Sequence, residues 1–294
     1  MSKLLIANLK RLKKNKLFWT IAVLFVVCTF FGLMNTYEYE QTLIEAHMEM
    51  EDSSFTPTTA TDLLFQMSSF IGLASAFMLA IFIGTEYHDN TMRNKLICGQ
   101  SRVTVYFANF FTSLLITLTF WLIPILVILC VGIPLLGTSP MTTALFTKII
   151  VTAAIGFLMC ASYTALFTLI AMLVHNRSYS LIGCISLALV LLFMGSMCES
   201  RLSEPETYPD YESTFTEEGL QQILVMEDIP NPMYLTGFSR QVVTFLYDFL
   251  PGGQSFQLLR NRFEHPLLCL IYSMGITGVT SLAGIYFYRK KDLK

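Results

Sequence analysis

Six long runs of apolar residues constrain this 294-residue chain more than any other feature of its sequence. A helix needs about 20 mostly apolar residues to cross the hydrocarbon core of a bilayer. Charged residues make up only 14% of the chain and apolar residues 54%, whereas a soluble domain carries roughly 25% charged residues. We therefore predict an all-α integral membrane protein with six transmembrane helices. The runs lie at about 17–36, 63–84, 104–136, 144–174, 179–198 and 266–288.

The third and fourth runs are longer than ~30 Å of hydrocarbon requires, so we expect them to tilt, kink or project beyond the membrane. Pro124 marks the expected kink in the third run, because proline cannot donate a backbone hydrogen bond. The first run is too long for the apolar part of a signal peptide, and no small-residue cleavage site follows it. We expect it to be retained as a span.

The basic residues are unevenly distributed and predict the orientation, since basic loops resist translocation. If the N-terminus, residues 86–102, residues 175–178 and residues 289–294 are cytoplasmic, 14 of the 19 Lys and Arg residues lie inside. Of the 21 acidic residues, 18 then lie in the outer segments or at their edges. Both termini are therefore expected in the cytoplasm. The net charge of −2 indicates no general attraction to nucleic acid.

The N-terminal residues 1–16 place Leu5, Leu9 and Leu12 at helical spacing among six lysines and arginines. This pattern predicts an amphipathic helix on the inner membrane surface, ahead of a transmembrane domain at 17–294. A basic tail that only sets the orientation is the alternative.

The longest extramembrane segment, residues 199–265, begins acidic and becomes apolar towards its end. Apolar residues at helical spacing from Val242 to Phe249 are followed by Leu250-Pro251-Gly252-Gly253 and a second apolar stretch. We expect a re-entrant hairpin that dips into the outer leaflet. A small folded extracellular cap is the alternative.

Several kinds of chemistry lack their residues in this sequence. Lys148 is the one charged residue inside the runs; its ammonium can reach water near the outer surface, with a substrate contact as the alternative. The sequence contains no GxSxG, no HExxH, no cysteine and histidine cluster with metal spacing, and no P-loop. The seven cysteines read as small apolar residues. We therefore expect no catalytic residues, no bound metal, and no cofactor held by this chain.

The segment between the second and third spans carries the most informative pattern. Thr85 is placed to cap a short polar helix, and Gly99 marks the end of that helix. Three short motifs follow one another along this segment. Such a helix on the membrane surface would present mixed charge to a cytoplasmic protein; a merely solvated connection is the alternative. The three motifs are Glu86-Tyr87, Thr91-Met92-Arg93 and Gly99-Gln100-Ser101-Arg102.

In the order and spacing of these motifs, the chain resembles the permease subunits of type-2 ATP-binding-cassette (ABC) exporters. Six spans, the basic N-terminal helix and the long outer segment extend the resemblance over nearly the whole chain. The resemblance implies that loop 86–102 couples the permease to a separate ATPase subunit, with residues 86–98 forming a coupling helix, and that helix 1–16 also touches the ATPase. It implies a lesser contact at the loop between the fourth and fifth spans. The implied coupling residues are Glu86, Tyr87, Thr91, Arg93, Lys95 and Arg102, with His175 and Arg177 in the second loop.

The resemblance also implies a function. Two permease chains, identical or paralogous, and two ATPase copies that bind ATP and Mg²⁺ would form an exporter in a bacterial cell membrane. The expected substrate is amphipathic or hydrophobic: a peptide antibiotic or bacteriocin, a drug or a lipid, so that export confers resistance. Phe120, Trp121 and Pro124 in the third span are candidates for the substrate pathway. The alternatives are a membrane scaffold, sensor or immunity subunit that transports nothing, and an ion channel.

Overall fold

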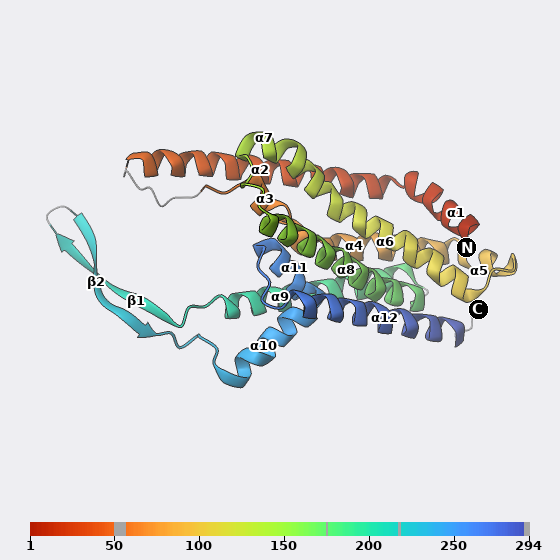
Figure 1. Ribbon diagram of the computed structural model, residues 1–294. Helices are drawn as coiled ribbons and strands as arrows, with labels where there is room; N and C mark the ends of the chain where they lie inside the picture. Colours follow the sequence, from red (N-terminus) through yellow and green to blue (C-terminus); the bar gives the residue numbers. More distant parts are fainter. Residues whose placement is uncertain (50–56, 175, 217–218, 291–294) are drawn as a thin grey trace.

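The computed structural model describes residues 1–49, 57–174, 176–216 and 219–290, which form an elongated helical bundle with a hairpin of strands at one end (Figure 1). In chain order its elements are α1 (Ser2–Lys13), α2 (Lys16–Glu49), α3 (Ala60–Leu63), α4 (Ser68–His88), α5 (Thr91–Ile97), α6 (Arg102–Val127), the π-helix η1 (Ile128–Gly132), α7 (Ile133–Leu136), α8 (Thr143–Leu173), α9 (Arg177–Leu202), β1 (Thr207–Thr216), β2 (Gly219–Pro230), α10 (Gly237–Phe249), α11 (Pro251–Arg260) and α12 (Pro266–Lys290).

Six helical segments of the described chain are long and apolar enough to cross a membrane, which confirms the six predicted spans. They are Lys16–Glu45, Ala60–His88, Arg102–Leu136, Thr143–Leu173, Arg177–Leu202 and Pro266–Lys290. The N-terminus, α5 and the last turns of α12 lie together at one end of the bundle (Figure 1).

The first span is longer than its apolar run. The sequence predicts an end near residue 36 and a loop from 37 to 61, but α2 continues to Glu49. Residues 37–49 contain neither glycine nor proline, so nothing in them stops a helix once the apolar part has formed. The polar end of α2 therefore extends beyond the apolar run.

The third span departs from α geometry near the predicted place. Pro124 lies inside α6, and the chain changes to a π-helix at Ile128–Gly132 before α7. The irregularity therefore lies four residues after the proline and not at Pro124 itself. A wider turn of this kind accommodates a helix whose hydrogen bonding the proline has interrupted.

Helix α4 is the centre of the bundle. Of its most apolar stretch, 67% of the residues are buried, compared with 17% in α12. It contacts α6, α8, α9 and α11. The Tyr163 ring of α8 packs on Gly72, where an added Cβ would lie 2.9 Å from the ring. The peripheral helices α2, α9 and α12 leave large apolar side chains exposed, as helices that face lipid do.

The outer segment between α9 and α12 contains two different parts. An antiparallel pair of strands, β1 and β2, projects from the bundle (Figure 1). No strands are predicted here from the sequence, and the structure corrects that prediction. Helices α10 and α11 form the expected hairpin around Pro251, and α11 packs against α4, α8 and α9. This part belongs to the bundle and is not a separate cap.

Glycines allow α11 to enter the bundle. A Cβ added at Gly252 would lie 1.9 Å from the Leu191 carbonyl oxygen of α9, and one added at Gly195 would lie 2.5 Å from the Gly252 carbonyl oxygen. Real Cβ atoms do not approach backbone atoms so closely. The two helix backbones therefore touch directly, as in the small-residue contacts of membrane helices.

The variant Gly252→Ala should lower the stability of the bundle by about 3 kcal/mol, because the new methyl group can be accommodated only if α9 and α11 move apart. Gly278→Ala in α12 is the matched control, since a Cβ there meets nothing within 4 Å. The measurement is thermal unfolding of the detergent-solubilised protein. Equal unfolding temperatures for the two variants would contradict the close contact.

Candidate functional site

The short helix α5 connects the second and third spans and starts later than predicted. The hydroxyl of Thr85 donates to the Ile81 carbonyl at 2.6 Å, as it does inside a continuous helix, so Thr85 is not an N-cap. Helix α4 runs on to His88, and the chain reverses at Asn90, whose φ of 54° is left-handed. Gly99, with φ 80°, follows α5, as the sequence predicts for the end of this helix. The predicted coupling helix 86–98 is therefore the end of α4 plus a separate seven-residue helix.

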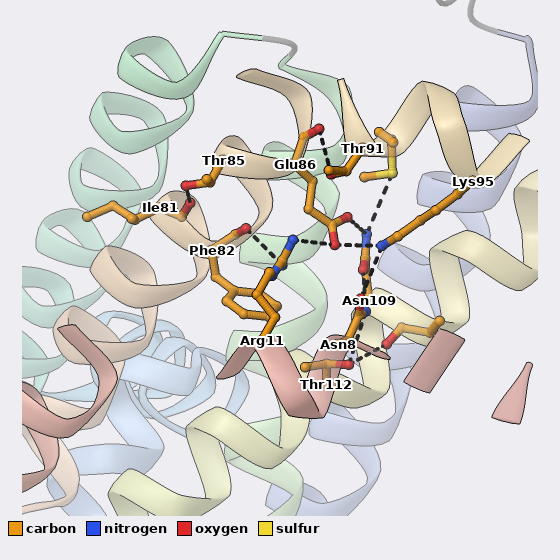
Figure 2. Close-up of polar contacts among 12 residues, drawn as sticks. Asn8, Arg11, Ile81, Phe82, Thr85, Glu86, Thr91, Lys95, Asn109 and Thr112 are labelled. Atoms are coloured by element: carbon orange, nitrogen blue, oxygen red, sulfur yellow. Dashed lines mark hydrogen bonds and ion pairs between the residues drawn. The ribbon is translucent and has the colours of Figure 1, made fainter. Parts of the chain in front are cut away.

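The last turns of α4 carry a buried carboxylate that binds two cations. The side chain of Glu86 has no exposed surface. Its Oε1 atom lies 2.7 Å from Nη1 of Arg11 and 2.5 Å from Nζ of Lys95. Arg11 comes from α1 and Lys95 from α5, and Figure 2 shows both converging on the carboxylate. Glu86 therefore joins the surface helix and the loop helix to the central span.

Two amides and a hydroxyl complete this cluster from α6 and α1. Nδ2 of Asn109 donates to the other carboxylate oxygen, Oε2, at 3.0 Å. Nδ2 of Asn8 donates to Oδ1 of Asn109 at 2.8 Å and to the Thr112 hydroxyl at 3.3 Å, and Oδ1 of Asn8 accepts from Lys95 at 3.1 Å. We call these six residues, Asn8, Arg11, Glu86, Lys95, Asn109 and Thr112, the Glu86 cluster. The cluster joins α1, α4, α5 and α6.

The electrostatics explain why these groups occur together. Burial lowers the pKa of Arg11 and the pKa of Lys95, and the neighbouring Glu86 carboxylate opposes this change in both. The Arg11 guanidinium also lies 3.8 Å from the centre of the Phe82 ring and donates to the Phe82 carbonyl at 3.1 Å. Buried charges are stable only when paired and hydrogen-bonded. Each member of the cluster therefore depends on the others.

The structure separates the predicted coupling residues into buried and exposed groups. Glu86 was expected to contact the ATPase partner. It is only 1% exposed, so its side chain faces the chain's own interior instead, and this expectation is corrected. Lys95 is partly buried beside it. The Tyr87 hydroxyl donates to the Met172 carbonyl at 2.7 Å, and the Thr91 hydroxyl to the Glu86 carbonyl at 3.1 Å. These four residues hold the loop in place.

Arg102 and the second loop take different positions. Nη1 of Arg102 donates to the carbonyls of Tyr288 and Arg289 at 3.1 and 3.0 Å, and so binds the end of α12. His175 lies outside the described residues. Arg177 is exposed at the start of α9 and packs beside Gly84.

The exposed side of α5 is the part of this region that is available to a partner. Arg93, Asn94, Ile97 and Cys98 are exposed, with Ile97 73% exposed, and we call these four residues the α5 surface. A groove of about 490 Å³ lies near it between the ends of α4 and α9; its walls include His88 and Arg177. A partner can therefore reach these side chains without any change in the buried Glu86 cluster.

Three of the six residues of the Glu86 cluster are not predicted from the sequence. Asn8, Asn109 and Thr112 are not singled out there, and Arg11 is treated as one of several basic residues. One signal was available: Asn109 is a lone amide near the start of an apolar run, and such residues inside membrane helices usually have a partner. The sequence does not give the identity of that partner.

The candidate pathway residues lie in the packed interior. The Phe120 ring stacks between Phe18 and Phe25 of α2, with centroids 5.6 and 5.8 Å away. Trp121 stacks on Phe65 and covers Gly156, and Pro124 is buried. In this structure they do not line an open path, so a part in transport stays a prediction for them. Among the described residues, no cluster of three His, Cys, Asp or Glu residues is placed to hold a metal ion.

Glu86→Gln should destabilise the protein by about 3 kcal/mol, because Arg11 and Lys95 lose their only counter-charge within the cluster. Adding Lys95→Met to that variant should restore part of the loss, since one unpaired cation is then removed. Glu45→Gln, the same substitution at an exposed position of α2, is the control and should unfold like the wild type. Thermal unfolding in detergent measures the wild type, the control, each single variant and the double variant; additive effects of the two substitutions would argue against a shared cluster.

Comparison with known proteins agrees with this geometry. The family model described as ABC-2 family transporter protein matches residues 4–195, from α1 into α9. No curated protein matches the chain. The matched region holds four of the six spans and most of the fifth, together with the whole Glu86 cluster, and it covers well over half of the 294 residues. The chain therefore belongs to the ABC-2 family of transporter permeases.

Proposed function

We propose that this chain forms one half of an export pathway in a bacterial cell membrane, with both termini in the cytoplasm. The family and the six apolar helices make it a transmembrane permease subunit of an ABC transporter, which works with an ATPase partner. The proposal adds a second permease chain, identical or paralogous, and two ATPase copies that bind ATP and Mg²⁺. It also adds the direction of transport.

One observation carries the proposal: the exposed α5 surface is mechanically joined to the bundle. Helix α5 is seven residues long and lies between two left-handed residues. Lys95 on its inner side binds Glu86 of α4 and Asn8 of α1. A force applied to Arg93 and Ile97 on the outer side is therefore passed to α1, α4 and α6 together.

In the proposed mechanism, ATP binding closes the two ATPase copies and moves the α5 surfaces that they hold. The permease halves then change between inward-facing and outward-facing packing, because each packing has its own set of contacts with the moving helices. This chain supplies no group to the hydrolysis of ATP. Its part is to dock the ATPase and to convert the movement into a change of helix packing.

An apolar groove supports an amphipathic or hydrophobic substrate, such as a peptide antibiotic or bacteriocin, a drug or a lipid. The groove lies between α2 and α4, has a volume of about 600 Å³ and is lined by apolar side chains, among them Phe25, Phe70 and Phe77. Phe25 also stacks on Phe120, so one ring separates the groove from a candidate pathway residue. A site of this size and character favours apolar ligands.

Arg93→Glu should weaken the complex with the ATPase at least about tenfold, because it reverses an exposed charge at the centre of the α5 surface. The measurement is co-purification of the tagged permease with its partner ABC ATPase. Arg201→Glu is the control, since Arg201 is exposed at the opposite end of the bundle. If Arg93→Glu retains the ATPase as the control does, the α5 surface is not the docking site.

The proposed orientation predicts that Cys98, exposed at the end of α5, reacts with a membrane-impermeant maleimide in inside-out vesicles and not in intact cells. Cys98→Ser removes this signal and shows the background from the other cysteines. Met233→Cys, at a position 54% exposed beyond the strand hairpin, should react in intact cells. Labelling of Cys98 from outside would overturn the orientation.

A further inference from the structure

A charged pocket lies at the end of the bundle opposite α1 and α5, and neither the family nor the proposed function uses it. Its volume is about 420 Å³. It is bounded by the first turns of α8, the last turn of α9, the helices α10 and α11, and the link 261–264 that leads to α12. Pockets that hold small ligands or headgroups have volumes in this range, about 300 to 1,000 Å³.

Two acidic side chains in the wall of the pocket, Glu199 and Asp248, already have partners within the protein. Nε of Arg260 lies 3.1 Å from Oε1 of Glu199, and the Tyr247 hydroxyl donates to the same carboxylate. Asp248 is 4% exposed; its Oδ2 lies 3.1 Å from Nδ1 of His265 and its Oδ1 accepts from Gln257 at 2.9 Å. These groups hold α9, α10 and α11 together and leave no charge of their own for a ligand.

Three further charged residues of the lining have no such partner. Within the described part of the chain, Lys148, Arg262 and Glu264 form no ion pair, and all three are exposed. Two cations and one carboxylate are therefore available at one opening. Their charges complement a ligand that carries both a phosphate and an ammonium group, since lysine and arginine bind phosphate oxygens and a carboxylate binds an ammonium.

The surroundings indicate that such a ligand is a lipid. Lys148 stands in the second turn of the span that starts at Thr143, and Glu264 stands two residues before the span that starts at Pro266. Both positions correspond to the end of the hydrocarbon region. Exposed apolar side chains lie close by in sequence: Phe146, 55% exposed, and Leu267, 72% exposed. The charged opening is thus at headgroup level with apolar surface beside it.

We propose that this pocket binds the headgroup of a zwitterionic phospholipid of the phosphatidylethanolamine class, with Lys148 and Arg262 on the phosphate and Glu264 on the ammonium. The site goes beyond the proposed function, because a lipid bound here need not be the exported substrate. The proposal also gives Lys148, the one charged residue within the apolar runs, a phosphate group to bind. Contact of its ammonium with water alone would give it no ligand.

Binding of soluble dihexanoyl lipids to the purified full-length protein in detergent tests the proposal. Lys148→Gln with Arg262→Gln should weaken binding of both phosphatidylethanolamine and phosphatidylglycerol about tenfold, since charge-assisted hydrogen bonds to the phosphate are lost. Glu264→Gln should weaken binding of phosphatidylethanolamine alone. Arg201→Gln, an exposed cation at the same end outside the pocket lining, should leave both unchanged. Dihexanoylglycerol, which lacks the phosphate, should bind more weakly than either phospholipid.

Three results would overturn the proposal. The first is unchanged binding in the double variant, and the second is an equal loss in Arg201→Gln. In the third, inorganic phosphate displaces the lipid as effectively as the lipid itself does, which would reassign the cations to a free phosphate ion. All the variants change exposed side chains, and their thermal unfolding shows whether the fold is kept. No arm of the test involves the ATPase, so its failure leaves the proposed function standing.

Discussion

The buried carboxylate of Glu86 is the constraint on which the organisation of this end of the protein depends. A charge without exposed surface is tolerated only when its partners surround it, and here the partners come from α1, α5 and α6. Because each partner belongs to a different helix, the positions of all four helices are fixed by one group. An apolar contact would allow the helices to slide, whereas the contacts of Glu86, which are 2.5 to 3.0 Å long, do not.

The opposite end of the bundle is held by a different means. There α9 and α11 touch through Gly195 and Gly252, and the amide of Gln254 donates to the carbonyls of Asp248 and Cys269 and accepts from Ser273. Backbone contact and this buried amide network act there together with the Arg260–Glu199 pair, which is more exposed than the Glu86 cluster. Between the two ends the helices meet mainly through apolar side chains, which permit more than one packing. Two fixed ends and an adaptable middle suit a protein that changes between two packings.

The sequence predicts features that depend on local composition and misses features that depend on residues far apart in the chain. The spans follow from hydropathy, because lipid imposes an apolar surface on every residue of a run. The end of a span depends on local stop signals. Glu86 lies past the apolar run but before His88, where α4 ends, so the prediction that Glu86 belongs to a separate loop helix is wrong. The partners of Glu86 are separated from it by 75 residues on one side and 23 on the other. No local pattern contains that information, and the strands β1 and β2 likewise depend on pairing within an acidic segment.

The position of α5 explains how a docking surface and a structural cluster share one short helix. Arg93 and Lys95 are two residues apart, so they point to different sides of α5, one exposed and the other against Glu86. The left-handed residues Asn90 and Gly99 separate α5 from α4 and α6, so α5 is a distinct helix. Because Lys95 binds Glu86, a rotation of α5 would have to move or break this ion pair. Helix α1 is tied to the same cluster and ends at Lys13, just before Asn15 caps α2 through the Leu17 amide at 2.9 Å. The first span is therefore joined to the cluster in two ways, along the chain through Lys14 and through α6, whose Phe120 stacks on Phe18 and Phe25.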